Sequence, residues 1–248
     1  MSDYQSIHID QILFLDVETV PQSAHFDELD SDFQHLWNKK SALFRKESET
    51  AADVYQRAGI YAEFGKIVCI SVGMVRFREK EPYLRLKSFF GKDEKAILQN
   101  FIELISKISG HGTPWLCGHN VKEFDLPFIS RRMLVNGLTL PDVLNVTGKK
   151  PWETSFIDTL ELWKFGDYKH FTSLELLTKI FGIPTPKDDI DGSQVAQIFY
   201  ENNDIERIAR YCEKDVTAVV QLLLKFRGNP LISNHLIESA TGLPEQHN

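Results

Sequence analysis

The stretch Ile12-Leu13-Phe14-Leu15-Asp16-Val17-Glu18-Thr19 decides the fold of this chain. Four successive apolar residues predict a buried strand, and two carboxylates separated by one residue follow them. Because side chains alternate between the two faces of a strand, Asp16 and Glu18 point to one side and Val17 to the other. Two carboxylates at the end of a buried strand repel each other and lose hydration, which a bound cation offsets. The alternative is that both lie in solvent where the strand ends.

Composition places the chain among ordinary globular proteins. It has 248 residues, of which 42% are hydrophobic and 25% are charged, and this length is within the range of one α/β domain. The formal net charge is -7 and the isoelectric point is about 5.6. This acidic balance argues against broad, non-specific coating of nucleic acid, but it allows an enzyme that binds nucleic acid locally.

Cysteine usage and the lack of targeting signals indicate a cellular compartment. Cys69, Cys117 and Cys212 are scattered, and no CxxC pair occurs, which argues against structural zinc and against a disulfide framework. The sequence has no signal peptide and no apolar run near membrane-spanning length. We therefore expect a reduced, cytoplasmic location without contact to a membrane.

Hydrophobic periodicity predicts alternating strands and helices along the chain. The predicted strands cover residues 7–15, 66–75, 83–90, 114–117 and 156–160, and the second and third form an antiparallel hairpin. Helices are predicted over residues 92–108, 125–134, 172–182, 195–200 and 203–226. Residues 22–61 show helical spacing without a strand, which predicts a helical insertion that either only packs or forms a lip over an active site. The polar tail from about residue 228 is expected to be poorly ordered.

Two further groups of polar residues follow later elements. Asn120, Phe124 and Asp125 come after the fourth predicted strand, and Asp125 could be only the N-cap of the helix that follows. Asp158 ends the fifth strand, and we interpret it as a turn or cap residue rather than an active-site carboxylate.

The last long helix carries a tyrosine and a carboxylate one turn apart. Tyr211 and Asp215 have i, i+4 spacing and therefore share one helix face, from which both can reach a single point outside the helix. The alternative is a tyrosine at the edge of the core beside a solvated aspartate.

Taken in order, Asp16-x-Glu18, Asn120-x-x-x-Phe124-Asp125 and Tyr211-x-x-x-Asp215 resemble the three exonuclease motifs of the DEDD superfamily, in its tyrosine-bearing DEDDy branch. The resemblance is greatest to the proofreading domains of family-B DNA polymerases and their small stand-alone relatives, and it spans about residues 12–226. It implies a single 3′–5′ exonuclease domain over residues 1–248 with a ribonuclease H-like fold. That fold has a mixed five-stranded sheet, its first three strands antiparallel, with helices on both faces.

The resemblance also implies roles for individual residues. Asp16, Glu18, Asp125 and Asp215 would hold two divalent cations, Mg²⁺ or Mn²⁺, which take oxygen ligands. Asp16 would bridge the ions, Glu18 and Asp215 would complete the site that activates water, and Asp125 would support the second ion through water. Tyr211 would orient the attacking water, because a neutral phenol is a poor base at pH 7.

Substrate contacts follow from the same resemblance. Thr19 would meet the terminal 3′-hydroxyl through its backbone, and Asn120 and Phe124 would lie near the last nucleotides, although Phe124 could equally be a core aromatic. The expected substrate is the 3′ end of single-stranded DNA or RNA, cleaved to nucleoside 5′-monophosphates. A few of the basic residues that flank the motifs could contact phosphates: Lys122, Arg131, Arg132, Lys149, Lys150, Lys164, Lys169 and Lys187.

Two alternatives remain at this point. A domain of this fold can lose its activity and persist as a nucleic-acid-binding or scaffold module, and an RNA-processing enzyme of the same fold is also possible. No polymerase domain follows Asp215, so a proofreading or repair role would need a polymerase or repair partner in trans.

Overall fold

Strand β1, Ile12–Pro21, lies inside the sheet of the computed structural model, which describes residues 4–110, 112–167, 169, 171–184 and 190–242. It pairs antiparallel with β2, Gly65–Arg78, and parallel with β4, Trp115–Gly118. The strand order is β5-β4-β1-β2-β3-β6, where β3 is Glu81–Phe90, β5 is Phe156–Asp158 and β6 is Ile237–Ser239. Strand β3 is antiparallel to β2, whereas β5 and β6 run parallel to their neighbours β4 and β3. The expected mixed sheet with three antiparallel first strands is confirmed, with six strands instead of five in the described part of the chain.

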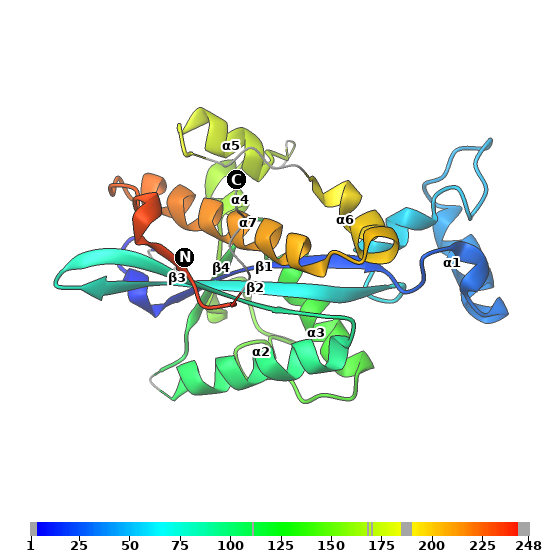
Figure 1. Ribbon diagram of the computed structural model, residues 1–248, viewed down its shortest axis with the longest axis horizontal. Coiled ribbons are helices and arrows are strands. Elements are labelled where there is room, and N and C mark those ends of the chain that lie inside the picture. The colour runs from blue at the N-terminus through cyan, green and yellow to red at the C-terminus, as the bar shows by residue number, and fades with distance from the viewer. Residues whose placement is uncertain (1–3, 111, 168, 170, 185–189, 243–248) are drawn as a thin grey trace.

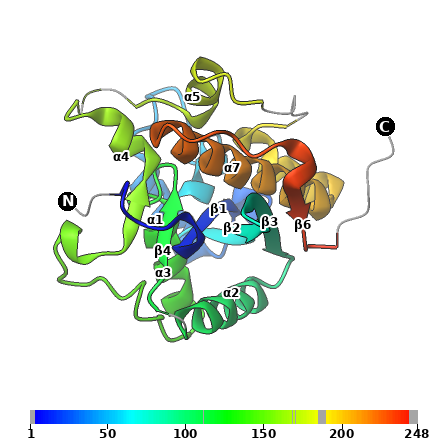
Figure 2. The ribbon, with the colours of Figure 1, turned by 90° about the vertical axis from the view of Figure 1, so that its left-hand side faces the viewer.

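Helices cover both faces of this sheet (Figures 1 and 2). One face carries α2, Glu94–Ser109, and α3, Asp125–Val135. The long helix α7, Ile205–Phe226, crosses the other face. On the same side lie α4, Thr159–Lys164, α5, Leu174–Ile180, and α6, Val195–Gln197, which continues as a π-turn over Ile198–Asn202. Short 3₁₀ turns occupy Ile9–Gln11, Phe26–Glu28, Tyr55–Ile60, Pro151–Glu153, Gly192–Gln194 and Asn234–Leu236. Among the described residues, no helix combines the length and apolar character needed to cross a bilayer.

The alternation of side chains along β1 assigns a face to each residue. Leu13, Leu15 and Val17 belong to the core shared with α2 and α3, whereas Ile12 and Phe14 belong to the core shared with α7. The row that faces α7 continues into Asp16 and Glu18 because the strand period is two. The carboxylate pair is therefore presented to the last helix.

Strand β1 begins and ends later than expected. The prediction over residues 7–15 is wrong at both ends, because residues 9–11 form a 3₁₀ turn and pairing with β2 continues to Pro21. Ile7 and Ile9 nevertheless pack on the core, so their apolar character resembled that of a strand. Both carboxylates consequently lie within the strand, just before an irregularity in the pairing between Glu18 and Thr19.

The segment after residue 228 is folded in its described part, contrary to the expected disorder. Buried Ile232 exchanges two hydrogen bonds with the side chain of Gln221 on α7, and β6 then pairs with β3. The carboxylate of Glu213 accepts hydrogen bonds from the hydroxyls of Ser239 and Thr241. These partners lie on α7 and β3, outside the segment itself. Local periodicity therefore did not reveal them.

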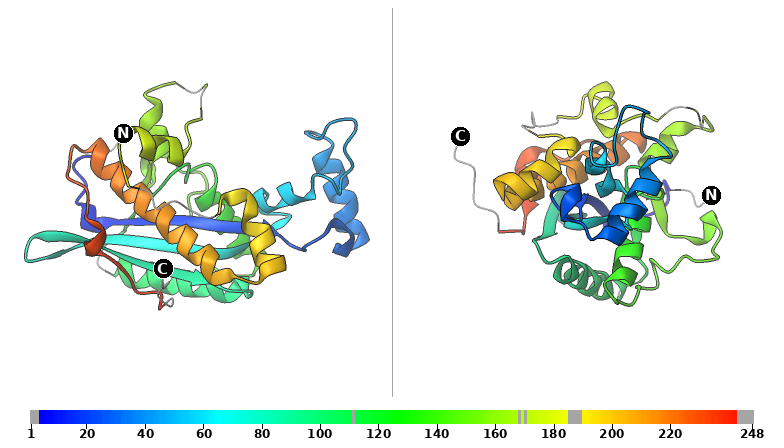
Figure 3. Two further views of the ribbon diagram at one scale, coloured as in Figure 1. Left: turned by 45° about the horizontal axis from the view of Figure 1, so that its top comes forward. Right: turned by 90° about the vertical axis from the view of Figure 1, so that its right-hand side faces the viewer.

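Residues 22–61 contain no strand, as expected, and form α1, Ser31–Ser41, with two 3₁₀ turns. Figures 1 and 3 show this segment projecting beyond the end of the sheet. It has its own aromatic core around the fully buried Trp37, whose indole N–H donates to the carbonyl of Ala51 at 2.8 Å. Asp30 caps α1 by accepting hydrogen bonds from the backbone N–H groups of Asp32 and Phe33.

A buried ion pair joins the two helices on the α2 face. The guanidinium of Arg132 contacts the Glu94 carboxylate at 2.6 and 2.8 Å and donates to the carbonyl of Ala62 at 2.9 Å. Glu94 also accepts the backbone N–H of Ile67. Arg132 is only 5% exposed, so the expectation that it could contact phosphate is wrong.

This pair predicts a difference between two adjacent arginines. Arg132→Met leaves the Glu94 carboxylate buried without its partner, which we expect to lower the free energy of unfolding by about 3–5 kcal/mol. Arg131→Met alters an exposed side chain and should change it by less than about 0.5 kcal/mol. Urea denaturation of both variants measures the two values, and equal values would contradict the assignment.

Candidate active site

Asp16 and Glu18 lie on the face of β1 that α7 covers. Ligand atoms of Asp16, Glu18 and Cys212 all lie within 4.8 Å of one another. Glu18 is buried and Asp16 is half-buried, so these carboxylates are not the solvated strand end of the alternative interpretation. The shared face predicted from the i, i+2 spacing is confirmed.

Helix α7 brings the tyrosine motif to the same place. The helix begins after Asp204, whose carboxylate accepts the backbone N–H of Arg207 at 3.1 Å, and its apolar stripe packs on the sheet. One turn separates Tyr211 from Asp215, and the Asp215 carboxylate acts on the Tyr211 phenol through its charge and hydrogen bonding. The charge of Asp215 acts on both Asp16 and Glu18, so all three carboxylates converge.

Asp125 reaches this cluster from the other side of β1. It is the first residue of α3 rather than its N-cap, and only 4% of it is exposed. The backbone N–H of Val17, between Asp16 and Glu18, acts on its carboxylate, and so does the charge of Asp215. The structure therefore brings all four predicted carboxylates and Tyr211 together, from β1, α3 and α7.

The loop before Asp125 has a tightly constrained backbone. A Cβ at Gly118 would come within 2.8 Å of the Val121 side chain and 3.0 Å of the Leu15 carbonyl, so only glycine fits. Asn120 has a φ of +62°, in the left-handed region that asparagine tolerates better than most residues. Asn120 therefore has a backbone role, and its predicted contact with nucleotides stays a prediction.

Burial and mutual repulsion disfavour the charged forms of this cluster. Burial, followed by the charges of Asp215 and Asp125, raises the pKa of Asp16 well above its usual range. Burial and the charge of Asp16 likewise raise the pKa of Glu18 well above its usual range. Burial raises the pKa of Asp125 to about 7, although the N–H of Val17 opposes the shift. A divalent cation would relieve this repulsion.

The donor set fits hard cations rather than zinc. Cys212 lies beside Asp16, but its Sγ donates a hydrogen bond to Asp16 Oδ2 at 3.3 Å, and burial raises the pKa of the thiol well above its usual value. A protonated thiol is not a metal ligand, since thiolate is the coordinating form. The carboxylate oxygens that remain are the ligands preferred by Mg²⁺ and Mn²⁺.

Tyr211 is held in its neutral form. Burial, followed by the charge of Asp215, raises its pKa further above the ordinary value for a phenol. The phenol thus keeps its proton at neutral pH and cannot act as a general base. It can orient a water molecule through its oxygen.

The remaining predicted contact residues are distributed around the cluster. Thr19 follows the carboxylates on β1 and is half-buried. Phe124 is partly buried, packs on the core and lies 5.6 Å from the ring of Phe128, so it has the core contacts of the alternative interpretation. Lys122 is ion-paired with Glu161. Arg131, Lys149, Lys150 and Lys169 are exposed, Lys164 is half-buried, and Lys187 lies outside the described residues.

Sequence reasoning missed two features of the site. Cys212 follows the motif tyrosine, and nothing in the sequence signalled its contact with Asp16. Asp158 is the N-cap of α4, as interpreted, but it also accepts the backbone N–H groups of Asn120 and Lys122 at 2.9 and 3.0 Å. Its position at the end of a strand beside β4 was the available signal.

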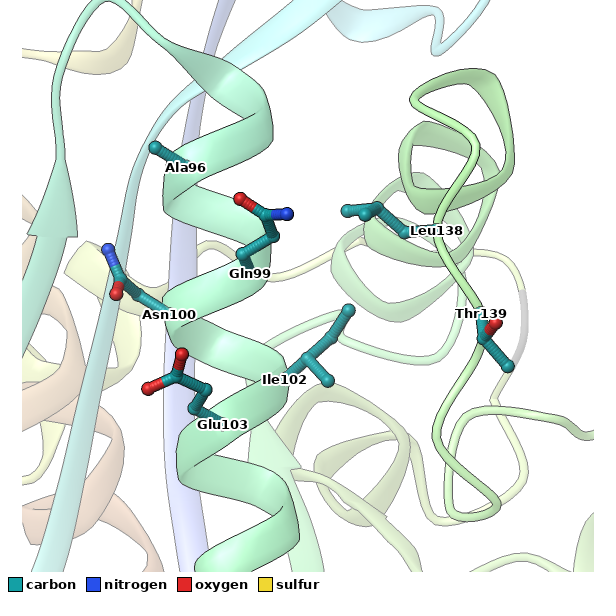
Figure 4. Close-up of a pocket in the computed structure, with 7 residues that line it drawn as sticks. All are labelled: Ala96, Gln99, Asn100, Ile102, Glu103, Leu138 and Thr139. Carbon is teal, nitrogen blue, oxygen red and sulfur yellow. The ribbon is translucent and has the colours of Figure 1, made fainter.

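A groove of about 480 Å³ lies elsewhere on the molecule, between α2 and the chain at Leu138 and Thr139 (Figure 4). It is on the sheet face opposite to α7, so it is separate from the carboxylate cluster. Its lining combines amides, one carboxylate and aliphatic groups.

Known proteins resemble this chain in sequence and in fold. The family model described as predicted 3′–5′ exonuclease related to the exonuclease domain of PolB matches residues 60–236. The match contains Asp125, Tyr211 and Asp215 and begins after Asp16 and Glu18. No curated protein sequence matches the chain.

Among solved structures, the family B DNA polymerase from the hyperthermophilic archaeon Pyrobaculum calidifontis has a similar fold, with a TM-score of 0.51 and 15% sequence identity. The similarity covers 87% of this chain and 24% of the polymerase chain, so this chain corresponds to about a quarter of that protein.

The raised pKa values predict how stability depends on pH and metal. A carboxyl whose pKa is higher in the folded than in the unfolded state destabilises the fold as the pH rises from the unfolded value, about 4, through the folded value. We therefore expect that Asp16→Asn in chelator at pH 8 melts several degrees above wild type, since 1 kcal/mol corresponds to about 2–4 °C for a chain of this size. At pH 4 the difference should shrink, because the carboxyl is then protonated in the folded state and about half protonated in the unfolded state.

Addition of Mn²⁺ at pH 8 should reverse this order, because it raises the melting temperature of wild type more than that of Asp16→Asn. Thermal unfolding with and without chelator measures both effects, and the exposed Asp142→Asn serves as control. A wild-type melting temperature that Mn²⁺ leaves unchanged would contradict the predicted metal site.

Proposed function

The chain belongs to the family of predicted 3′–5′ exonucleases related to the exonuclease domain of PolB, and we propose that it shortens single-stranded DNA or RNA from the 3′ end with two divalent cations. The cations would be Mg²⁺ or Mn²⁺, held by Asp16, Glu18, Asp125 and Asp215. The observation that carries this proposal is the convergence of these buried, mutually repelling carboxylates from three elements.

Phosphodiester hydrolysis needs a nucleophile at neutral pH and a stabilised leaving oxygen. A pair of divalent cations supplies both by lowering the pKa of bound water and neutralising the developing charge. Asp16 would bridge the two ions, since the charges of Asp125 and Asp215 act on it and its own charge acts on Glu18. The burial of the cluster strengthens these electrostatic interactions.

Tyr211 acts as a positioning group in this proposal. Because the phenol stays protonated beside Asp215, its O–H can donate to that carboxylate while its oxygen accepts a hydrogen bond from the attacking water. The water can thereby be aligned opposite the leaving 3′-oxygen. The products would be a nucleoside 5′-monophosphate and a strand shorter by one nucleotide.

The proposed substrate is an unpaired 3′ end, since terminal bases must leave a duplex to reach a recessed site. Thr19, at the pairing irregularity of β1, would face the terminal hydroxyl through its backbone. Asn120 and Phe124 would flank the last nucleotides from the loop before α3. A polymerase or repair protein acting in trans is a proposed partner.

A catalytically silent binding module is the second candidate, which the complete ligand set disfavours. Loss of one carboxylate would favour it, but Asp16, Glu18, Asp125, Asp215 and Tyr211 are all present and converge.

The test uses 5′-labelled single-stranded DNA and RNA oligonucleotides with Mg²⁺ or Mn²⁺. We expect a ladder that shortens from the 3′ end and disappears with excess chelator. Asp16→Ala and Asp215→Ala should abolish it, because each removes a charge that holds the cations. Circular dichroism should show that both variants are folded.

A separate expectation concerns the tyrosine. Tyr211→Phe removes the oxygen that orients water but no charge, so the rate should fall by less than the roughly 10²–10⁴-fold contributed by a general base. Single-turnover cleavage rates measure this effect. Cleavage by wild type in excess chelator, or tight binding of both oligonucleotides without any cleavage, would argue against the proposed enzyme.

A further inference from the structure

The first turn of α4 contacts the loop that leads to Asp125. Asp158 caps this short helix, and its Oδ1 accepts the backbone N–H groups of Leu160 and Glu161 at 3.0 and 3.4 Å. These two bonds satisfy the ordinary needs of a helix start. Asp158 makes two more hydrogen bonds, and both go to a different part of the chain.

The additional bonds hold the loop after β4. Asp158 Oδ1 accepts the backbone N–H of Asn120 at 2.9 Å, and Oδ2 accepts that of Lys122 at 3.0 Å. Asp158 is 4% exposed, so water cannot readily replace it as an acceptor. A partly buried N–H that loses its partner is costly, which ties the loop to this carboxylate.

Two further residues of this turn, Thr159 and Glu161, add contacts to the same loop. The Thr159 hydroxyl donates to the carbonyl of Gly118 at 3.2 Å and lies 2.9 Å from Nδ1 of His119. The carboxylate of Glu161 forms an ion pair with the ammonium of Lys122. The side chains of Asp158, Thr159 and Glu161, all in one helical turn, therefore bind residues 118–122.

A short chain of contacts leads from Asp158 to the predicted metal ligand. The carbonyl of Asn120, whose N–H is bound to Asp158, accepts the N–H of Phe124 at 3.0 Å. Asp125 is the next residue, and its carboxylate is acted on by the N–H of Val17 and the charge of Asp215. Asn120 keeps its left-handed backbone within this arrangement. Displacement of the loop at Asn120 would thus be passed to Asp125 through one hydrogen bond and one peptide unit.

We propose that Asp158 is a positioning residue for the exonuclease, which fixes the loop that presents Asp125 and Asn120. The proposal rests on the proposed function, since it assigns Asp158 an effect on the cation site that Asp125 helps to form. Asp158 itself does not touch the reacting atoms. Its effect goes beyond helix capping, because a cap needs no bonds to Asn120 and Lys122.

The test separates positioning from capping with two matched pairs of variants. Asp158→Asn keeps a carbonyl oxygen for the cap and for the N–H of Asn120 but places an NH₂ group against the N–H of Lys122, so the loop loses one of its two bonds and is displaced at Lys122 while α4 stays capped. Asp158→Ala removes all four bonds. Asp30→Asn and Asp30→Ala are the controls. The Asp30 carboxylate caps α1 by accepting two backbone N–H groups, and both of these groups belong to α1 itself.

Calorimetric titration with Mn²⁺ is the main readout, made on protein shown to be folded by circular dichroism. We expect Asp158→Asn to bind Mn²⁺ about 10- to 100-fold more weakly than wild type, the usual effect of removing a group that orients a metal ligand. The Asp30 variants should bind as wild type does. In cleavage assays, kcat for Asp158→Asn should fall while KM for the oligonucleotide changes little.

The outcomes distinguish this inference from the proposed function. Wild-type Mn²⁺ affinity and kcat in folded Asp158→Asn would overturn the positioning role alone. A wild-type chain that neither binds Mn²⁺ nor shortens any oligonucleotide would overturn the proposed function and the inference with it. If Asp158→Ala does not fold, Asp158→Asn decides the question.

Discussion

Repulsion among buried carboxylates is the constraint on which the rest of the structure depends. Burial and mutual charge raise the pKa values of Asp16, Glu18 and Asp125, so the fold concentrates negative charge where water hydrates it poorly. Such an arrangement is unfavourable in the absence of a cation, and stability alone would replace it with apolar side chains. The energetic conflict is therefore itself an indication of function, because perturbed carboxylates cluster at catalytic and metal-binding sites. For this chain the family of predicted 3′–5′ exonucleases provides the corresponding chemistry.

The surrounding elements hold the cluster against this repulsion. Strand β1 is paired on both sides within the sheet, and α7 is anchored by its long apolar face and by the C-terminal segment that ends at β6. Asp125 lies where a constrained loop enters α3, and the N–H of Val17 on β1 favours the charged form of its carboxylate. Asp158 and the first turn of α4 hold the other end of this loop. Each of these carboxylates is thus carried by a rigid element rather than by a free loop, which limits relaxation of the charges away from one another.

The sequence predicted those features that depend only on the periodicity of side chains along one strand or helix. The i, i+2 spacing of Asp16 and Glu18 and the i, i+4 spacing of Tyr211 and Asp215 each predicted a shared face, and three motifs in order predicted the sheet and its helices. Partners that are distant in sequence were not predictable in this way. The end of β1 is decided by pairing with β2, the sixth strand by pairing with β3, and the burial of Arg132 by Glu94 on another helix. Asp158 illustrates the limit most clearly, because its capping role is local and was predicted, whereas its bonds to Asn120 and Lys122 depend on the packing of β5 beside β4.

The most direct test of this account is to count the cations and protons that the folded chain exchanges. Calorimetric titration of the metal-free protein with Mn²⁺ near pH 6.5, in two buffers with different ionisation enthalpies, gives both numbers. The account predicts two ions per chain and a net release of protons, because carboxyls with raised pKa values must ionise to become ligands. Saturation without proton release, or no binding at millimolar Mn²⁺, would contradict the central claim that buried carboxylate repulsion is balanced by divalent cations.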